Sequence, residues 1–253
     1  MVRAMRKLGE NLKLVDVVVE AIDARLVHSG ANPTLERLIG RKPRIVVLTR
    51  ADLAEHPITK RWLAAFKERA ITALAVDARE QRAVGRIGTL LAGVATKPHG
   101  TLRAMVVGIP NSGKSTIVNG LLHRRAAKIE NRAGVTRRTQ WFRLSPDVEL
   151  MDTPGVLVPK ITTKSAQWKL AAIGAVPRER YEAQEVAANL AHWLANRSAR
   201  RAPSLEAFAA ERGFLRRGGK VDEHNAAQSY LRAFDEGQFG RISLESPDES
   251  ETA

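Results

Sequence analysis

The chain has 253 residues, enough for one large domain or for a medium domain with a smaller one beside it. It has no cysteine, which excludes disulfides and thiolate metal sites, and no apolar run approaches the ~20 residues that a membrane-spanning helix needs. Lys and Arg outnumber Asp and Glu by 41 to 27, and the net charge of +14 favours a polyanionic partner, although Arg-rich solvated faces would give the same balance. We expect a soluble cytoplasmic protein.

The first hundred residues alternate strand and helix patterns. β-branched and apolar runs predict strands over residues 15–22, 44–48 and 70–76, and the segments between and after them have helical spacing. Each predicted strand leads into a loop that carries an acidic residue: Asp23, Asp52 and Asp77. This alternation predicts an α/β fold with a doubly wound, mostly parallel sheet, whose ligands bind at the carboxyl ends of the strands.

A phosphate-binding motif follows a fourth predicted strand. Residues 108–116, Gly-Ile-Pro-Asn-Ser-Gly-Lys-Ser-Thr, fit G-x-x-x-x-G-K-[ST] between an apolar strand over 102–107 and a helix. Such a loop aims backbone N–H groups and a helix N-terminus at phosphate oxygens, while its lysine reaches the β- and γ-phosphates and its serine binds Mg²⁺. The predicted nucleotide contacts in this loop are Asn111, Ser112, Gly113, Lys114, Ser115 and Thr116, with Ser115 also a ligand of Mg²⁺.

Two segments after this loop are typical of nucleotide switches. Residues 131–138 have no apolar periodicity, and strands predicted over 140–144 and 148–151 lead into Asp152-Thr153-Pro154-Gly155, a D-x-x-G sequence. In such switches the Asp orients the Mg²⁺ shell and the Gly N–H meets the γ-phosphate. We therefore assign Asp152 and the Thr136 hydroxyl to Mg²⁺ and Gly155 to the γ-phosphate. The predicted catalytic set is Lys114, Thr136 and Gly155.

Strand patterns end near residue 159. Helical spacing predicts helices over residues 165–173, 179–196, 204–211 and 222–235, the last one capped by Asp222. These segments predict a small all-helical domain with a basic surface. We place the α/β domain at residues 1–175 and the helical domain at residues 176–253.

The residues that would read a nucleotide base stand before the phosphate loop. A GTPase usually reads guanine with the Asp of an N-K-x-D loop at a strand end, downstream of D-x-x-G. No strand is predicted downstream here, so the candidate is Thr49-Arg50-Ala51-Asp52, with Asp77-Ala78 in the next loop, where a Ser-Ala pair usually backs the base. The sequence therefore implies a circular permutation, which costs little because the termini of a domain usually lie close together.

That order resembles the circularly permuted GTPases, and specifically the ribosome biogenesis GTPase A family, over essentially the whole chain. The resemblance implies a circularly permuted P-loop GTPase that helps to mature the large ribosomal subunit, with a helical C-terminal domain that contacts ribosomal RNA. The positive net charge agrees with an RNA partner. The matching stretches are residues 12–25, Asn32-Pro33, 42–45, 108–116, 134–136, 152–159 and 239–243.

Three features depart from the family's pattern. In the base-reading loop Asp52 keeps the guanine-reading carboxylate, whereas Thr49 replaces Asn and Arg50 replaces the Lys stem with a bulkier planar cation. Asp77 stands where the family often has Ser. The family's N-terminal Phe-Pro-Gly-His-Met segment aligns only from its Met, at Met1, so the family's proposed catalytic His falls before residue 1. Either the start is assigned too late or that His is missing.

The expected hydrolysis chemistry also differs from that of small GTPases. Val156 stands after the D-x-x-G in place of a Gln, and an alkyl group cannot orient an attacking water. Asn111 matches GTPases that hold a K⁺ ion as a fixed positive charge between phosphates, with a plain turn residue after Pro110 as the alternative. We expect a monomer that binds GTP or GDP with Mg²⁺, hydrolyses GTP slowly and is stimulated by ribosomal particles.

Two other functions fit parts of the pattern. A nucleotide-gated rRNA-binding assembly scaffold with little hydrolysis is consistent with Val156 and with the absent N-terminal His. An ATP-using P-loop kinase is disfavoured by Asp52 after a strand and by the lack of an acceptor-site motif.

Overall fold

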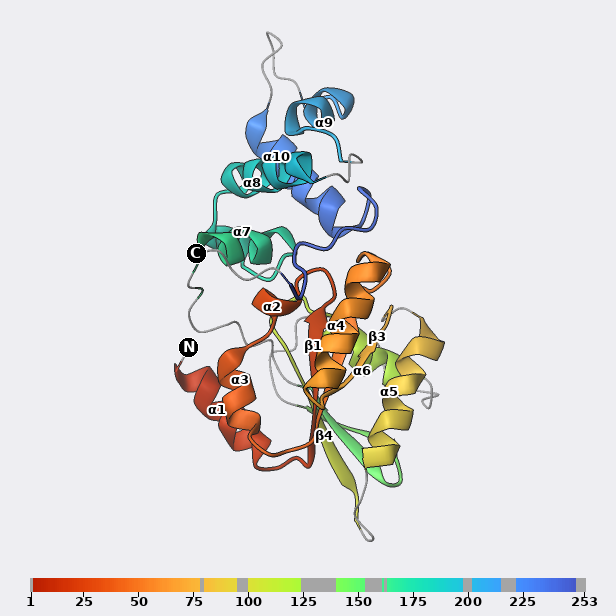
Figure 1. Ribbon diagram of the computed structural model, residues 1–253. Coiled ribbons are helices and arrows are strands. Elements are labelled where there is room, and N and C mark those ends of the chain that lie inside the picture. Colours follow the sequence, from red (N-terminus) through yellow and green to blue (C-terminus); the bar gives the residue numbers. More distant parts are fainter. Residues whose placement is uncertain are drawn as a thin grey trace.

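The computed structural model describes residues 2–77, 80–94, 100–123, 140–152, 161, 163–197, 202–214 and 222–248. Within these residues an α/β part, which holds the sheet, adjoins a helical part built from the C-terminal helices (Figure 1). None of the described helices is long and apolar enough to cross a membrane.

A six-stranded sheet forms the centre of the α/β part, in the order β3-β2-β1-β4-β6-β5. Neighbouring strands are parallel except β5 and β6, which form an antiparallel hairpin at one edge. The doubly wound, mostly parallel sheet predicted from the sequence is confirmed. The strands are β1 (Val17–Asp23), β2 (Arg44–Thr49), β3 (Thr72–Ala75), β4 (Leu102–Val107), β5 (Gln140–Ser145) and β6 (Val148–Asp152).

Helices cover both faces of the sheet, which explains why β1 is an unbroken buried run. Because side chains alternate along a strand, Val17 and Val19 pack toward α5 and α6, while Val18 packs toward α1 and α3. Phe66 of α4 packs on that second face, over β2. The helices of this part are α1 (Val2–Leu12), α2 (Val27–Gly30), α3 (Pro33–Ile39), α4 (His56–Glu68), α5 (Gln81–Val94) and α6 (Lys114–His123).

Several elements differ from the predicted ones in their bounds. β3 begins at Thr72 rather than at residue 70, because α4 runs to Glu68 and Ala70 then takes a left-handed φ of 53°. The helix predicted over 179–196 is instead a 3₁₀ turn, η1 (Arg178–Arg180), followed by α8 (Ala183–Asn196). The four-residue helix α2 is too short to show a hydrophobic period.

Aromatic side chains form the centre of the helical part. Phe208 stands edge-on to Tyr230, with ring centroids 5.2 Å apart, and Phe239 contacts both rings. Burial raises the pKa of Tyr230 to about 12, and the Tyr230 hydroxyl donates to the Pro203 carbonyl at 2.9 Å. The other helices of this part are α7 (Lys164–Ala172), α9 (Leu205–Glu211) and α10 (Glu223–Asp235).

The helical part and the α/β part share apolar contacts. Leu26, after β1, and Ile109, in the phosphate loop, belong to the same buried cluster as side chains of α7, α8 and α10. α7 precedes residue 175, where we divide the chain, and packs against α8. The division itself stays a prediction.

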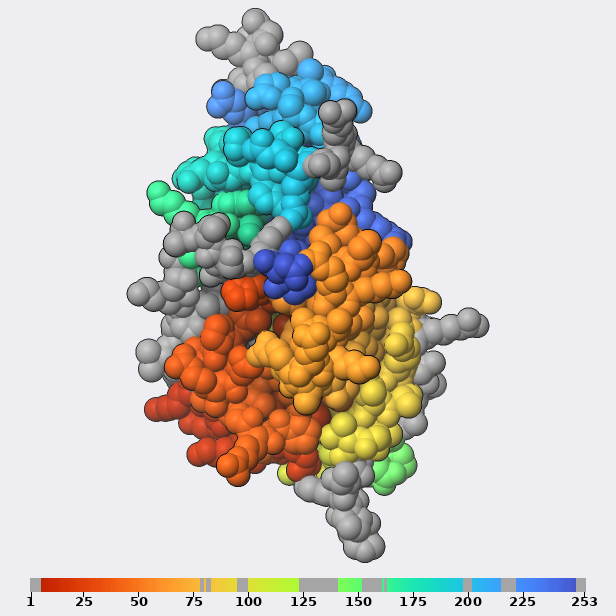
Figure 2. Space-filling view, in the orientation of Figure 1, coloured from red at the N-terminus to blue at the C-terminus, as the bar shows by residue number. Residues whose placement is uncertain are grey.

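The segment after α10 returns to the α/β part. Ile242 N–H donates to the Leu53 carbonyl at 2.9 Å, and Leu244 N–H donates to the Arg25 carbonyl at 2.7 Å. The buried Glu245 carboxylate accepts hydrogen bonds from the backbone N–H groups of His28 and Ser29, at 2.8 and 3.0 Å. This segment, dark blue in Figure 2, therefore fastens the loops that follow β1 and β2.

We expect Glu245→Ala to lower the free energy of unfolding by about 1 kcal/mol, because it leaves the partly buried N–H groups of His28 and Ser29 in α2 without this acceptor. Urea unfolding measures the change. Glu211→Ala, at an exposed position of α9, is the matched control and should shift stability by less than about 0.5 kcal/mol. Equal effects of the two substitutions would contradict the anchoring role of Glu245.

Candidate nucleotide-binding site

The predicted phosphate loop lies where β4 meets α6, beside the ends of β1 and β2. Gly108 has a φ of 151°, and a Cβ there would come within 2.4 Å of the Ala21 carbonyl oxygen of β1. Gly113 has a φ of 82°, and a Cβ there would lie 3.3 Å from the Thr49 side chain. Both positions therefore require glycine, because the loop is pressed against two neighbouring strands.

Donors of the phosphate loop surround the start of α6. Lys114 is 7% exposed as a residue, and its ammonium donates to the Ile109 carbonyl at 2.7 Å. The Ser115 and Thr116 residues are exposed at the helix N-terminus. The Ser112 hydroxyl is buried and has no hydrogen-bond partner among the described residues. This arrangement presents hydroxyl, ammonium and backbone N–H donors to an anion.

The predicted base-reading loop adjoins the phosphate loop. The Thr49 hydroxyl lies 2.9 Å from the Ser112 carbonyl oxygen and 3.2 Å from the Ile22 carbonyl oxygen, so the ends of β1 and β2 and the phosphate loop are joined at one point. Asp52 follows in the same loop and is half-buried, and Asp77 comes after β3. Segments separated by about sixty residues in the sequence thus form one edge of the sheet, as a circularly permuted order requires.

Part of the predicted set cannot be located. Ala78, Thr136 and Gly155 lie outside the described residues. The backbone of Asp152 ends β6 opposite Val106 of β4, which brings it to the same edge of the sheet as the phosphate loop. The roles of these four residues stay predictions.

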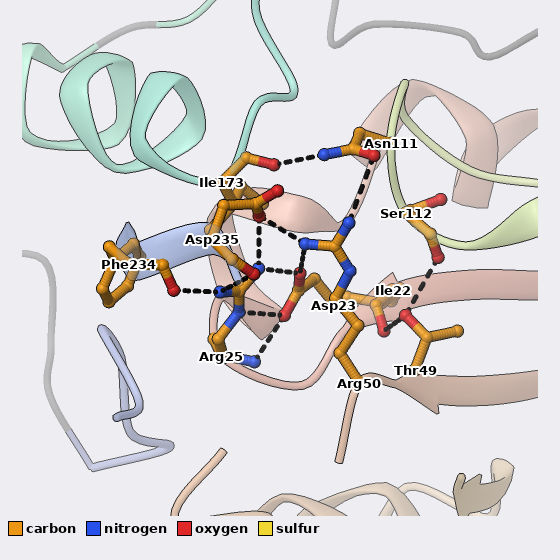
Figure 3. Close-up of polar contacts among 10 residues, drawn as sticks. All are labelled: Ile22, Asp23, Arg25, Thr49, Arg50, Asn111, Ser112, Ile173, Phe234 and Asp235. Atoms are coloured by element: carbon orange, nitrogen blue, oxygen red, sulfur yellow. Dashed lines mark hydrogen bonds and ion pairs between the residues drawn. The ribbon is translucent and has the colours of Figure 1, made fainter. Parts of the chain in front are cut away.

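A buried ion pair, which sequence reasoning had not assigned to the site, lies beneath these loops (Figure 3). The Arg25 guanidinium binds both carboxylate oxygens of Asp23, at 3.0 and 2.8 Å, and neither side chain is more than 1% exposed. It also donates to the Asp235 carboxylate of α10 at 2.9 Å and to the Phe234 carbonyl at 3.3 Å. Burial alone would raise the pKa of the Asp23 carboxyl, but Arg25 outweighs burial and holds that pKa below its usual value.

Arg50 extends this pair to the phosphate loop (Figure 3). One guanidinium nitrogen binds the Asp235 carboxylate and lies 3.7 Å from Asp23, while another donates to the Asn111 side-chain oxygen at 3.2 Å. The Asn111 amide nitrogen in turn donates to the Ile173 carbonyl at 2.8 Å. The predicted residues Arg50 and Asn111 are therefore in contact with each other and, through Asp235 and Ile173, with the helical part.

Asp23→Asn should lower the free energy of unfolding at pH 7 by about 3 kcal/mol, because it removes the main partner of a buried guanidinium. The pKa of Asp23 in the folded protein lies below its unfolded value of about 3.9. The stability that the ionised Asp23 contributes is therefore fully present above about pH 3.9, and it is lost as the pH falls through the folded-state pKa. Urea unfolding of both proteins from pH 7 to pH 3 measures the difference. A difference that already shrinks between pH 7 and pH 5 would contradict this assignment. Glu149→Gln, whose partner Arg103 is exposed, is the control.

Comparisons with known proteins agree with this arrangement. A family model described as 50S ribosome-binding GTPase matches residues 103–206. Ribosome biogenesis GTPase A of Priestia megaterium is 34% identical over 99% of this chain and 96% of its own length, and that of Thermotoga maritima is 32% identical over 98% and 92%. A solved structure of GDP-bound YlqF is 31% identical to this chain, with a TM-score of 0.78, and the match covers 96% of this chain and 100% of that one. A structure of GNP-bound YlqF from T. maritima is 30% identical with the same TM-score, and that match covers 98% of this chain and 100% of the other. With its predicted base-reading loop before its phosphate loop and relatives of this similarity along almost its whole length, the chain belongs to the ribosome biogenesis GTPase A family of circularly permuted GTPases.

Proposed function

We propose that this protein binds GTP at the phosphate loop and hydrolyses it to GDP and phosphate, as a switch in late assembly of the large ribosomal subunit. The observation that carries the proposal is the Thr49 hydroxyl, 2.9 Å from the Ser112 carbonyl, which holds the loop of Asp52 beside the phosphate loop. The Asp52 carboxylate, which would bind guanine, and the phosphate loop can then contact the same nucleotide. The names of the relatives, ribosome biogenesis GTPase A, support the assembly role.

The donors at the start of α6 fit a nucleotide with Mg²⁺. Ser115 and Thr116 are exposed, and the Lys114 ammonium, which donates to the Ile109 carbonyl, lies in the same loop. Mg²⁺, when bound, neutralises charge that develops on the phosphates, with Ser115, Thr136 and Asp152 as its proposed holders. Residues 111–116 bind and orient the phosphates, and Gly155 N–H meets the γ-phosphate. Thr49, Arg50, Asp52, Asp77 and Ala78 line the base.

The net charge of +14 over the whole chain supports an RNA partner. Ribosomal RNA carries one phosphate per nucleotide, and cationic side chains on a convex surface bind it through those phosphates. Monomeric state and cytoplasmic location remain predictions that accompany this proposal. The exposed arginines of the helical part and of the segment after it include Arg178, Arg180, Arg212, Arg232 and Arg241.

Guanine selectivity is expected to depend on Asp52. Its carboxylate accepts hydrogen bonds from guanine N1–H and the 2-amino group, so Asp52→Asn should weaken binding of fluorescent GTP by about a hundredfold while improving binding of the xanthine nucleotide, whose 2-oxo group accepts from an amide. Competition of fluorescent GTP by GTP, ATP and the xanthine triphosphate measures the selectivity. Displacement by ATP as effective as by GTP would instead support an ATP-using enzyme.

Hydrolysis should be slow for the protein alone and faster on its assembly partner, because Val156 replaces a water-orienting Gln. Phosphate release is to be followed with GTP, with and without large ribosomal subunits, and subunits should increase it by about tenfold or more. Lys114→Ala should abolish the stimulated release. GTP binding without release under either condition would favour the scaffold function over the switch.

A further inference from the structure

Asn111 is the residue on which a K⁺ ion was predicted, and both ends of its side-chain amide are already used. The amide nitrogen donates to the Ile173 carbonyl, which fixes the orientation of the side chain. The oxygen then faces Arg50 and accepts from its guanidinium at 3.2 Å. The residue after Ile173, Gly174, has no room for a Cβ, which would lie 2.8 Å from the Asn111 nitrogen. The side-chain amide of Asn111 therefore has a hydrogen-bond partner at each end.

Arg50 is held against this oxygen from several sides. Its backbone has a left-handed φ of 52° directly after the end of β2 at Thr49. One nitrogen of the guanidinium binds Asp235, itself bound to the buried Arg25, and the other reaches Asn111. A planar guanidinium can donate hydrogen bonds to two partners in different directions, whereas a lysine ammonium is a single point charge on a shorter side chain. The contact therefore depends on arginine at a position where the family has lysine.

A metal cation on the Asn111 oxygen would lie close to this guanidinium. Two positive charges on one carbonyl oxygen repel each other; Asn111 is exposed, so water reduces this repulsion, but the Arg50 guanidinium already occupies the oxygen. Asn111 as the structure orients it therefore does not fit K⁺. The two carboxylates nearby, Asp23 and Asp235, are already paired with guanidinium groups.

We propose that Arg50 supplies, within the chain, the fixed positive charge at Asn111 that a K⁺ ion would otherwise supply, so that nucleotide binding and turnover do not require K⁺. The inference rests on the proposed function, because it assigns Arg50 a part in the same GTP site. Asp235, from α10, is the positioning residue that keeps the guanidinium on the phosphate loop.

The test compares KCl with NaCl at equal ionic strength, so that general screening is the same in both. Dissociation of a fluorescent non-hydrolysable GTP analogue and phosphate release from GTP are measured for the wild type and for Arg50→Lys. The matched control is Arg103→Lys, which changes an exposed arginine near the amino end of β4, at the opposite end of that strand from the phosphate loop. Circular dichroism and fluorescent GTP binding show that each variant is folded.

For the wild type and Arg103→Lys, both rates should agree between the two salts within about twofold, since no selective ion site is involved. Arg50→Lys shortens the cation and frees the Asn111 oxygen, and its release of phosphate should become about tenfold faster in KCl than in NaCl, with slower analogue dissociation in KCl. A wild-type protein that itself needs K⁺, or an Arg50→Lys variant as indifferent to K⁺ as the wild type, would overturn the inference. No guanine-nucleotide binding in either salt would overturn the proposed function together with it.

Discussion

The buried pair of Asp23 and Arg25 is the contact through which the other loops of the site are joined. A guanidinium and a carboxylate that are both almost fully buried are tolerated only when their charges and hydrogen bonds are satisfied, and here Arg25 binds both oxygens of Asp23. The remaining donors of Arg25 reach the end of α10. The end of β1 is thereby tied to a helix more than two hundred residues later in the chain, and Arg50 connects the same carboxylates to the phosphate loop.

The sheet explains why a permuted chain forms a single site. β1 lies between β2 and β4, and all three are parallel, so their carboxyl ends meet at one edge whichever of them comes first in the sequence. The phosphate loop follows β4, and the predicted base-reading loop follows β2. The site requires that these strand ends lie next to one another. The Thr49 hydroxyl at the end of β2 shows that they do, because it lies within hydrogen-bond distance of the Ile22 carbonyl of β1 and of the Ser112 carbonyl of the phosphate loop. The order of the connections matters less, because crossovers only return the chain to the start of the next strand.

The C-terminal segment connects the helical part to the loops that follow β1 and β2. Ile242 and Leu244 donate to carbonyls in the loops after β2 and β1, and Glu245 binds the first N–H groups of α2. Asp235, at the end of α10, pairs with Arg50 from the same side. The loop after β2, the C-terminal segment and the end of α10 are therefore in direct contact with one another.

The sequence by itself determined the strands, most of the helices and the phosphate loop, because these depend on local patterns. Unbroken β-branched runs form β1 and β2, Asn32 caps α3 and Asp222 caps α10 through hydrogen bonds to residues two or three positions away. The position of Asp52 before the phosphate loop indicated the permutation. Only the tertiary structure decided that Arg50 contacts Asn111 and Asp235, since the partners are separated by 61 and 185 residues. An ion pair between distant segments leaves no periodicity in the sequence; it exists because the sheet and α10 bring the charged groups within a few ångströms and exclude water from the groups beneath them.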